Sequence, residues 1–104
     1  MKLTSKEIVA IDDLYASAAG NGFDFGFTDD VTSLPEASRG GVINSLAKKG
    51  LIINYTDDVF NQFQFTPLFW EMIGTRADGD VDYHPESSSD ARVAFGAWLA
   101  RIKT

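Results

Sequence analysis

The chain has 104 residues, 44% of them hydrophobic, and a formal net charge of −6. This composition predicts a single globular domain over residues 1–104 with an ordinary buried core. Because the chain contains no cysteine, disulfides, thiol catalysis and thiolate metal sites are excluded. The N-terminal residues lack the apolar run of a signal peptide, and no stretch is long enough to span a bilayer. We therefore expect a cytoplasmic protein that makes no contact with a membrane.

The first predicted helix begins at Thr4, because Glu7 three residues later completes a capping-box pattern. Apolar residues then recur at helical spacing, at Ile8, Ile11, Leu14, Tyr15 and Ala18. Gly20-Asn21-Gly22 predicts the end of this helix, since glycine and asparagine accept the left-handed conformation found there.

Two shorter elements are predicted between this helix and Pro35. Residues 23–27 alternate aromatic with small or polar side chains, which is typical of a short strand with one buried face. We expect this strand to pair with a later hairpin. Thr28-Asp29-Asp30 offers caps for a short second helix over about 29–34, which Pro35 ends.

A third helix is predicted to begin between Pro35 and Ser38 and to be closed by Gly50. Its apolar face carries Val42, Ile43 and Leu46, and its opposite face carries Gly41, Asn44, Ser45 and Lys48. Gly40 and Gly41 each cost roughly 1 kcal/mol relative to alanine inside a helix. The pair therefore predicts a close approach, either by the first helix or by a DNA backbone at the helix N-terminus.

After Gly50 the apolar pattern changes from helical to alternating. This change predicts a β-hairpin with strands over 51–56 and 60–65 and with Asp57-Asp58 as its turn. Thr66-Pro67 then caps and starts a helix over roughly 66–73. A polar loop over 74–88 precedes a last helix, which starts near 88–90 and runs to about Lys103.

The stretch Gly41-Val42-Ile43-Asn44-Ser45-Leu46-Ala47-Lys48-Lys49-Gly50-Leu51 follows the pattern Gly-Val-x-x-Ser-Leu-x-Lys-Lys-Gly-Leu. In this pattern and in the order of its elements the chain resembles the winged helix-turn-helix superfamily, and within it a group of small bacterial and phage proteins. The resemblance covers residues 4–66. It implies an α+β fold with a three-helix core and a β-hairpin wing, and 67–104 would add two C-terminal helices. Winged helices serve DNA binding and protein docking alike, so the resemblance leaves the function open.

The first functional hypothesis is a small DNA-binding regulator of bacterial or phage origin. Its third helix would contact double-stranded DNA through Arg39, Gly41, Asn44, Ser45, Lys48 and Lys49. Residues 38–50 hold three basic residues and no acidic one, which favours this hypothesis. Lys48 and Lys49 are equally suited to complement the C-terminal dipole of their own helix.

The second hypothesis is an acidic protein-interaction module, such as a phage-type inhibitor or adaptor, that binds a host protein and not DNA. The net charge of −6 favours this hypothesis. So does Asp57-Asp58 at the wing tip, which a phosphate backbone would repel.

No residue pattern predicts catalysis, a metal site or a cofactor. The Asp-x-Asp-x-Asp run at 78–82 resembles the start of a calcium loop, but Tyr83 and Ser89 stand where an EF-hand needs glycine and glutamate. His84 is the only histidine and has neither cysteine partners nor a nucleophile motif beside it. We therefore expect a protein that is not an enzyme.

The last predicted helix carries a wide apolar stripe of Phe95, Trp98, Leu99 and Ile102. An exposed stripe of this size marks an interface. One expectation is therefore a homodimer built on these four residues, which would suit a protein that binds two half-sites on DNA. The alternative is that the helix folds back over the first helix and Trp70 within one chain.

Overall fold

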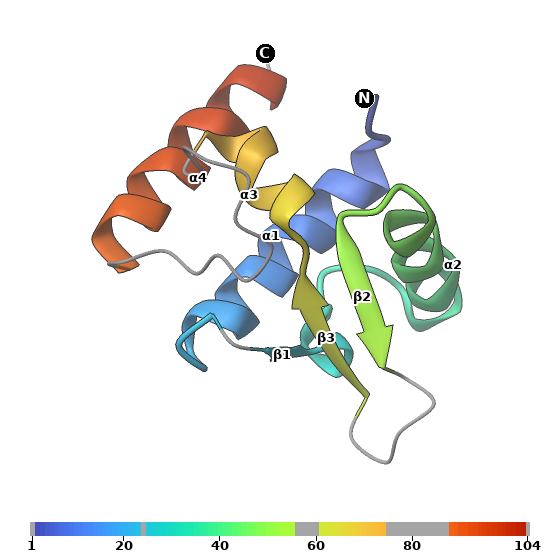
Figure 1. Cartoon of the computed structure of the whole chain (residues 1–104). Helices are drawn as coiled ribbons and strands as arrows, with labels where there is room; N and C mark the ends of the chain where they lie inside the picture. Colours follow the sequence, from blue (N-terminus) through green and yellow to red (C-terminus); the bar gives the residue numbers. More distant parts are fainter. Residues whose placement is uncertain (1, 24, 56–60, 75–87, 104) are drawn as a thin grey trace.

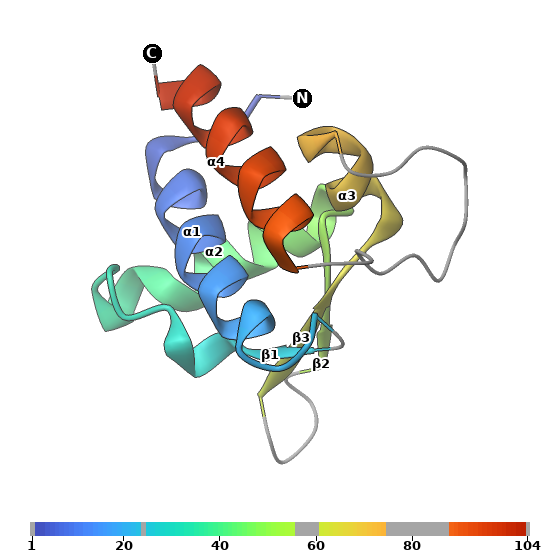
Figure 2. The same cartoon turned by 90° about the vertical axis from the view of Figure 1, so that its left-hand side faces the viewer.

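The computed structural model describes residues 2–23, 25–55, 61–74 and 88–103. They form an α+β structure of four α-helices, a short 3-10 helix and a three-stranded antiparallel sheet (Figure 1). In Figures 1 and 2, α1 (Ser5–Ala19) lies between α2 (Glu36–Lys48) on one side and α4 (Ser88–Lys103) on the other. One cluster of buried side chains joins the four helices and the sheet.

Helix α1 begins where the sequence predicts. The hydroxyl of Thr4 accepts the backbone N–H of Glu7 at 3.1 Å, and the carboxylate of Glu7 accepts the N–H of Thr4 at 2.8 Å. These two bonds complete the capping box. The core-facing side chains are Ala10, Ile11, Leu14, Tyr15 and Ala18, and all of them are buried. Glu7 is buried too, at 2% exposure, which the apolar pattern does not predict.

The strand predicted within 23–27 is present but short. Strand β1 (Gly26–Phe27) pairs antiparallel with β3 (Gln62–Phe65). The backbone at Gly26 is squeezed between α1 and β3, because a Cβ there would lie 2.7 Å from Cζ of Phe63 and 3.1 Å from the backbone nitrogen of Ala18. Only glycine fits this position without a shift of its neighbours.

The prediction of a helix over 29–34 is wrong. The chain forms one 3-10 turn, η1 (Thr28–Asp30), and then runs without regular structure to α2. Side chains of α1 hold this segment: Ser17 donates to the carboxylate of Asp30 at 2.6 Å, and Asp13 accepts the backbone N–H of Ser33 at 2.9 Å. Such side-chain bonds compete with a helical ladder, and Pro35 disfavours a helical conformation at the residue before it.

Helix α2 and the hairpin after it follow the prediction. α2 ends at Lys48, and Gly50 adopts a left-handed conformation with a φ of 80°. Strand β2 (Ile52–Tyr55) pairs with β3 in the register Ile52 to Phe65 and Tyr55 to Gln62. β3 is the central strand of the sheet, in the order β1-β3-β2. The predicted turn at Asp57-Asp58 lies outside the described residues.

Helix α3 (Pro67–Ile73) and α4 form at the predicted places, with Thr66 capping α3. Phe95 of α4 stacks parallel on Tyr15 of α1, with 4.0 Å between ring centroids. Phe95 and Trp98 are buried, and Leu99 and Ile102 pack half-buried against the same core. The expectation that this stripe is exposed is therefore wrong, because the helix folds back over α1, whereas a homodimer stays a prediction.

None of the described helices combines the length and the apolar character needed to cross a membrane. The aspartates of the run at 78–82, Tyr83 and His84 lie outside the described residues.

Candidate functional site

Two of the candidate DNA contacts, Ser45 on α2 and Lys49 just after it, are directed toward α1. Ser45 donates to Oε2 of Glu7 at 2.7 Å, and Nζ of Lys49 donates to Oε1 of Glu7 at 2.6 Å. Lys49 also donates to the carbonyl of Lys2 at 2.9 Å. The prediction that Ser45 shares an outward face with Gly41, Asn44 and Lys48 is wrong, because Ser45 points to Glu7, and Lys49 is engaged within the fold.

The carboxylate of Glu7 stays ionised in this arrangement. Burial alone would raise the pKa of Glu7, but hydrogen bonds from Lys49, the Thr4 N–H and Ser45, with the charge of Lys49, lower it from 4.5 to about 2. The ion pair neutralises Lys49, so this lysine contributes little to the electrostatic field outside the protein.

The outward strip of α2 is made of Gly41, Asn44 and Lys48, which are exposed, with Gly40 beside them. A Cβ placed at Gly40 or Gly41 would meet no atom of the described residues within 4 Å. The explanation that the glycine pair allows α1 to pack closely on α2 is therefore wrong. At the two glycines the backbone of α2 is therefore open to the outside.

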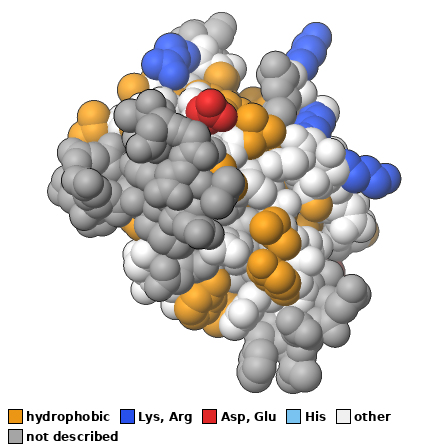
Figure 3. All heavy atoms as spheres, in the orientation of Figure 1, with side chains coloured by type: hydrophobic (Ala, Val, Ile, Leu, Met, Phe, Trp, Pro, Cys, Tyr) orange, Lys and Arg blue, Asp and Glu red, His pale blue; other side chains and the backbone are white. Residues whose placement is uncertain are grey.

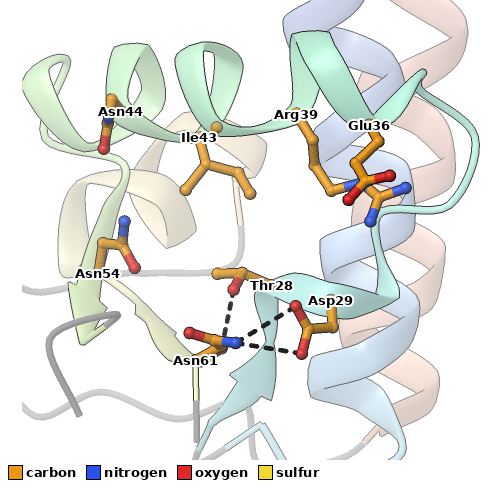
Figure 4. A pocket seen from close by; sticks show the side chains of 9 residues that line it. Thr28, Asp29, Glu36, Arg39, Ile43, Asn44, Asn54 and Asn61 are labelled. Carbon is orange, nitrogen blue, oxygen red and sulfur yellow. Dashed lines mark hydrogen bonds between the residues drawn. The ribbon is translucent and has the colours of Figure 1, made fainter. Parts of the chain in front are cut away.

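Arg39 lies at the inner border of this strip and is half-buried. Its Nη2 donates to the carbonyl of Leu34 at 3.5 Å. Its Nε is buried and has no hydrogen-bond partner in the described part of the chain. Figure 4 shows the side chain reaching from α2 into a pocket beside Glu36.

The pocket has a volume of about 380 Å³ and lies between α2, β2 and η1. Asn61 holds η1 in place beside the pocket. Its backbone carbonyl accepts the N–H of Thr28 at 2.8 Å, and its side-chain amide donates to the carboxylate of Asp29 at 3.2 Å. The lining is mostly polar: Thr28, Asp29, Glu36, Arg39, Gly40, Ile43, Asn44, Asn54 and Asn61. The sequence placed Arg39 and Asn44 at a candidate site, but no local pattern indicates that Asn54 and Asn61 lie beside them.

Exposed side chains of opposite charge flank α2. On the side toward α1, the exposed Lys6 lies 3.4 Å from the hydroxyl of Ser38, and Lys2 contacts Lys49 through its carbonyl. Together with Lys48, which is exposed on the outward strip at the C-terminal end of α2, Lys2 and Lys6 form what we call the lysine edge. Figure 3 shows blue side chains along the border where Figure 1 places the N-terminus and α2. On the other side, which we call the pocket edge, the carboxylates of Asp29 and Glu36 are exposed.

Among the described residues no group of three or more His, Cys, Asp or Glu side chains is arranged to hold a metal ion. No protein-family model, no curated protein and no solved structure matches the chain. The surface of α2 is therefore the basis for an inference about function.

Proposed function

We propose that the chain is a small, non-enzymatic DNA-binding regulator of the winged-helix type, with α2 as the reading helix. The order of helix, short strand, turn, helix and hairpin supports this fold. η1 stands where a second full helix is usual, which is a departure from the pattern.

The observation that carries the proposal is the Gly40-Gly41 pair. Two glycines inside a helix weaken it by roughly 1 kcal/mol each relative to alanine. In the part of the chain that the structure describes, a Cβ at either position would meet no atom within 4 Å. The pair is explained by a partner that approaches the backbone of α2 closely.

Duplex DNA fits that partner because of the side chains around the glycines. Asn44 is exposed on the same strip and can pair bidentately with adenine in the major groove. Lys48, also exposed, can contact a phosphate or a guanine. The lysine edge supplies further positive charge beside the strip.

The test is a binding titration of the protein against duplex DNA over a range of salt concentrations, with Lys48→Ala and Asn44→Ala. Loss of the lysine should weaken binding to all sequences and flatten the salt slope by about one unit. Loss of the asparagine should relax preference at one base pair, by roughly 1–3 kcal/mol. A parent protein that fails to bind DNA at about 50–100 mM salt excludes this function.

A second function, docking to a host protein through an acidic surface, has one observation in its favour. Asp29 and Glu36 stand at the rim of the pocket, whose amide-rich lining can both donate and accept hydrogen bonds. A pull-down from host lysate, run beside the titration, separates the two functions. Capture of a specific protein that Glu36→Lys abolishes and Lys48→Ala leaves unchanged would support protein docking.

A further inference from the structure

The positive and negative side chains around α2 lie on different sides of the helix, and this limits how DNA can lie on it. Lys6 of α1 reaches Ser38, Lys2 lies beside Lys49, and Lys48 is exposed at the C-terminal end of α2. Asp29 and Glu36 are exposed on the opposite side. The cation on that side, Arg39, is half-buried and donates to the carbonyl of Leu34.

A helix placed centrally in the major groove has a phosphate backbone on each side, because the groove is only slightly wider than the helix. With α2 in that position, one backbone would lie near the lysine edge and the other near the carboxylates of Asp29 and Glu36. A phosphate that comes within about one Debye length, ~8 Å at physiological salt, of these carboxylates is repelled by them. The central placement is therefore unfavourable.

Resting on the proposed function, we infer that a single sugar-phosphate backbone runs along the lysine edge, across the junction of α1 and α2. The pocket edge then faces away from phosphate. Lys6 of α1 and Lys2, just before α1, contribute to binding, although the sequence pattern points only to the third helix. Asn44 and the open backbone at Gly41 lie next to this edge and meet the bases nearest that strand.

The inference predicts a small number of neutralised phosphates. With three lysines engaged, log K should fall with log[salt] with a slope of about −3, since each phosphate contributes about −0.9. Lys2→Gln, Lys6→Gln and Lys48→Gln should each reduce the magnitude of the slope by about one. In each variant the loss of affinity between about 50 and 200 mM salt should be about 3.5-fold smaller than in the parent.

The experiment is fluorescence anisotropy with a labelled duplex of mixed sequence, measured for the parent and each variant across that salt range. Arg92→Gln is the matched control, because Arg92 is an exposed cation on α4, on the far side of α1 from α2. Its slope should equal that of the parent, as should the slope of Glu36→Gln. Melting temperatures equal to the parent's verify that the exposed substitutions leave the fold intact.

Two results would overturn the inference in different ways. If the parent binds and Lys2→Gln and Lys6→Gln keep its slope, or if Arg92→Gln lowers the slope equally, the lysine edge is wrong and the DNA-binding function stands. If the parent does not bind the duplex, the proposed function and the inference fall together.

Discussion

The carboxylate of Glu7, near the start of α1, and the ammonium of Lys49, just after α2, form an ion pair at 2.6 Å. Glu7 is 2% exposed and Lys49 29% exposed at the side chain. The same carboxylate accepts Ser45 and the N–H of Thr4. One buried side chain therefore completes the cap of α1 and fixes the position of α2 on it.

This contact predicts a loss of stability in acid. The pKa of Glu7 is about 2 in the folded protein against 4.5 as its ordinary value. The stabilisation is complete above about pH 4.5 and is lost as the pH falls toward 2. The free energy involved is on the order of 3 kcal/mol. Urea unfolding at a series of pH values measures it, and Glu7→Gln should remove this part of the pH dependence; an unchanged dependence would contradict the role of Glu7.

Gly40→Ala and Gly41→Ala should stabilise the fold. Alanine is favoured over glycine in a helix by roughly 1 kcal/mol, and a Cβ at either position meets nothing within 4 Å. Chemical denaturation should show this gain for both variants. If the strip is a DNA contact, the same variants should bind DNA more weakly, so stability and binding move in opposite directions.

Gly26→Ala should destabilise the fold, in contrast to the two helical glycines. The added methyl would overlap the ring of Phe63 and press on the backbone of Ala18, and overpacking of this kind costs about 1–3 kcal/mol. The midpoint of thermal unfolding reports the change. A variant as stable as the parent would mean that β1 is not held in the narrow slot between α1 and β3.

Tyr15→Phe should leave stability unchanged or raise it. The Tyr15 hydroxyl is buried without a hydrogen-bond partner in the described part of the chain, and burial raises its pKa. Removing an unsatisfied buried hydroxyl is neutral or favourable, while the ring keeps its stacking on Phe95. Tyr15→Ala is the contrasting variant and should lose about 3–5 kcal/mol, as large aromatic truncations in cores do.

Trp98→Ala should destabilise the fold by about 3–5 kcal/mol, because Trp98 is buried within its own chain. Val93 on the same helix is 73% exposed, so Val93→Ala should change stability by less than about 0.5 kcal/mol. Light scattering after size exclusion complements the unfolding data. A Trp98→Ala variant with unchanged stability and a halved mass would show that the residue serves a dimer instead.

Elements whose ends are set by neighbouring residues could be predicted from the sequence. The capping box of Thr4 and Glu7 fixes the start of α1, and Thr66-Pro67 fixes the start of α3. The change of apolar period at Gly50 predicted the hairpin, and the aromatic alternation before Thr28 predicted a strand that pairs with it. In each case the deciding interaction spans only a few residues.

The predictions that are wrong concern residues whose position depends on contacts between segments far apart in the sequence. The predicted helix over 29–34 is replaced by η1, because Ser17 and Asp13 from α1 bind that segment. The polar side chain of Ser45 predicts a place on the outer face of α2, but its hydrogen-bond partner is Glu7, 38 residues away in the chain. Of the pocket, the sequence indicated Arg39 and Asn44, while Asn54 and Asn61 reach it only through the pairing of strands.

The central position of β3 has a consequence for synthesis of the protein. A freshly formed hairpin of β2 and β3 leaves one edge of β3 with unpaired backbone groups, and such an edge is a template for aggregation. In the finished sheet β1 covers that edge at Gln62 and Phe63. Because β1 precedes β3 in the chain, and chains emerge from the ribosome N-terminus first, the covering strand is already made when β3 appears.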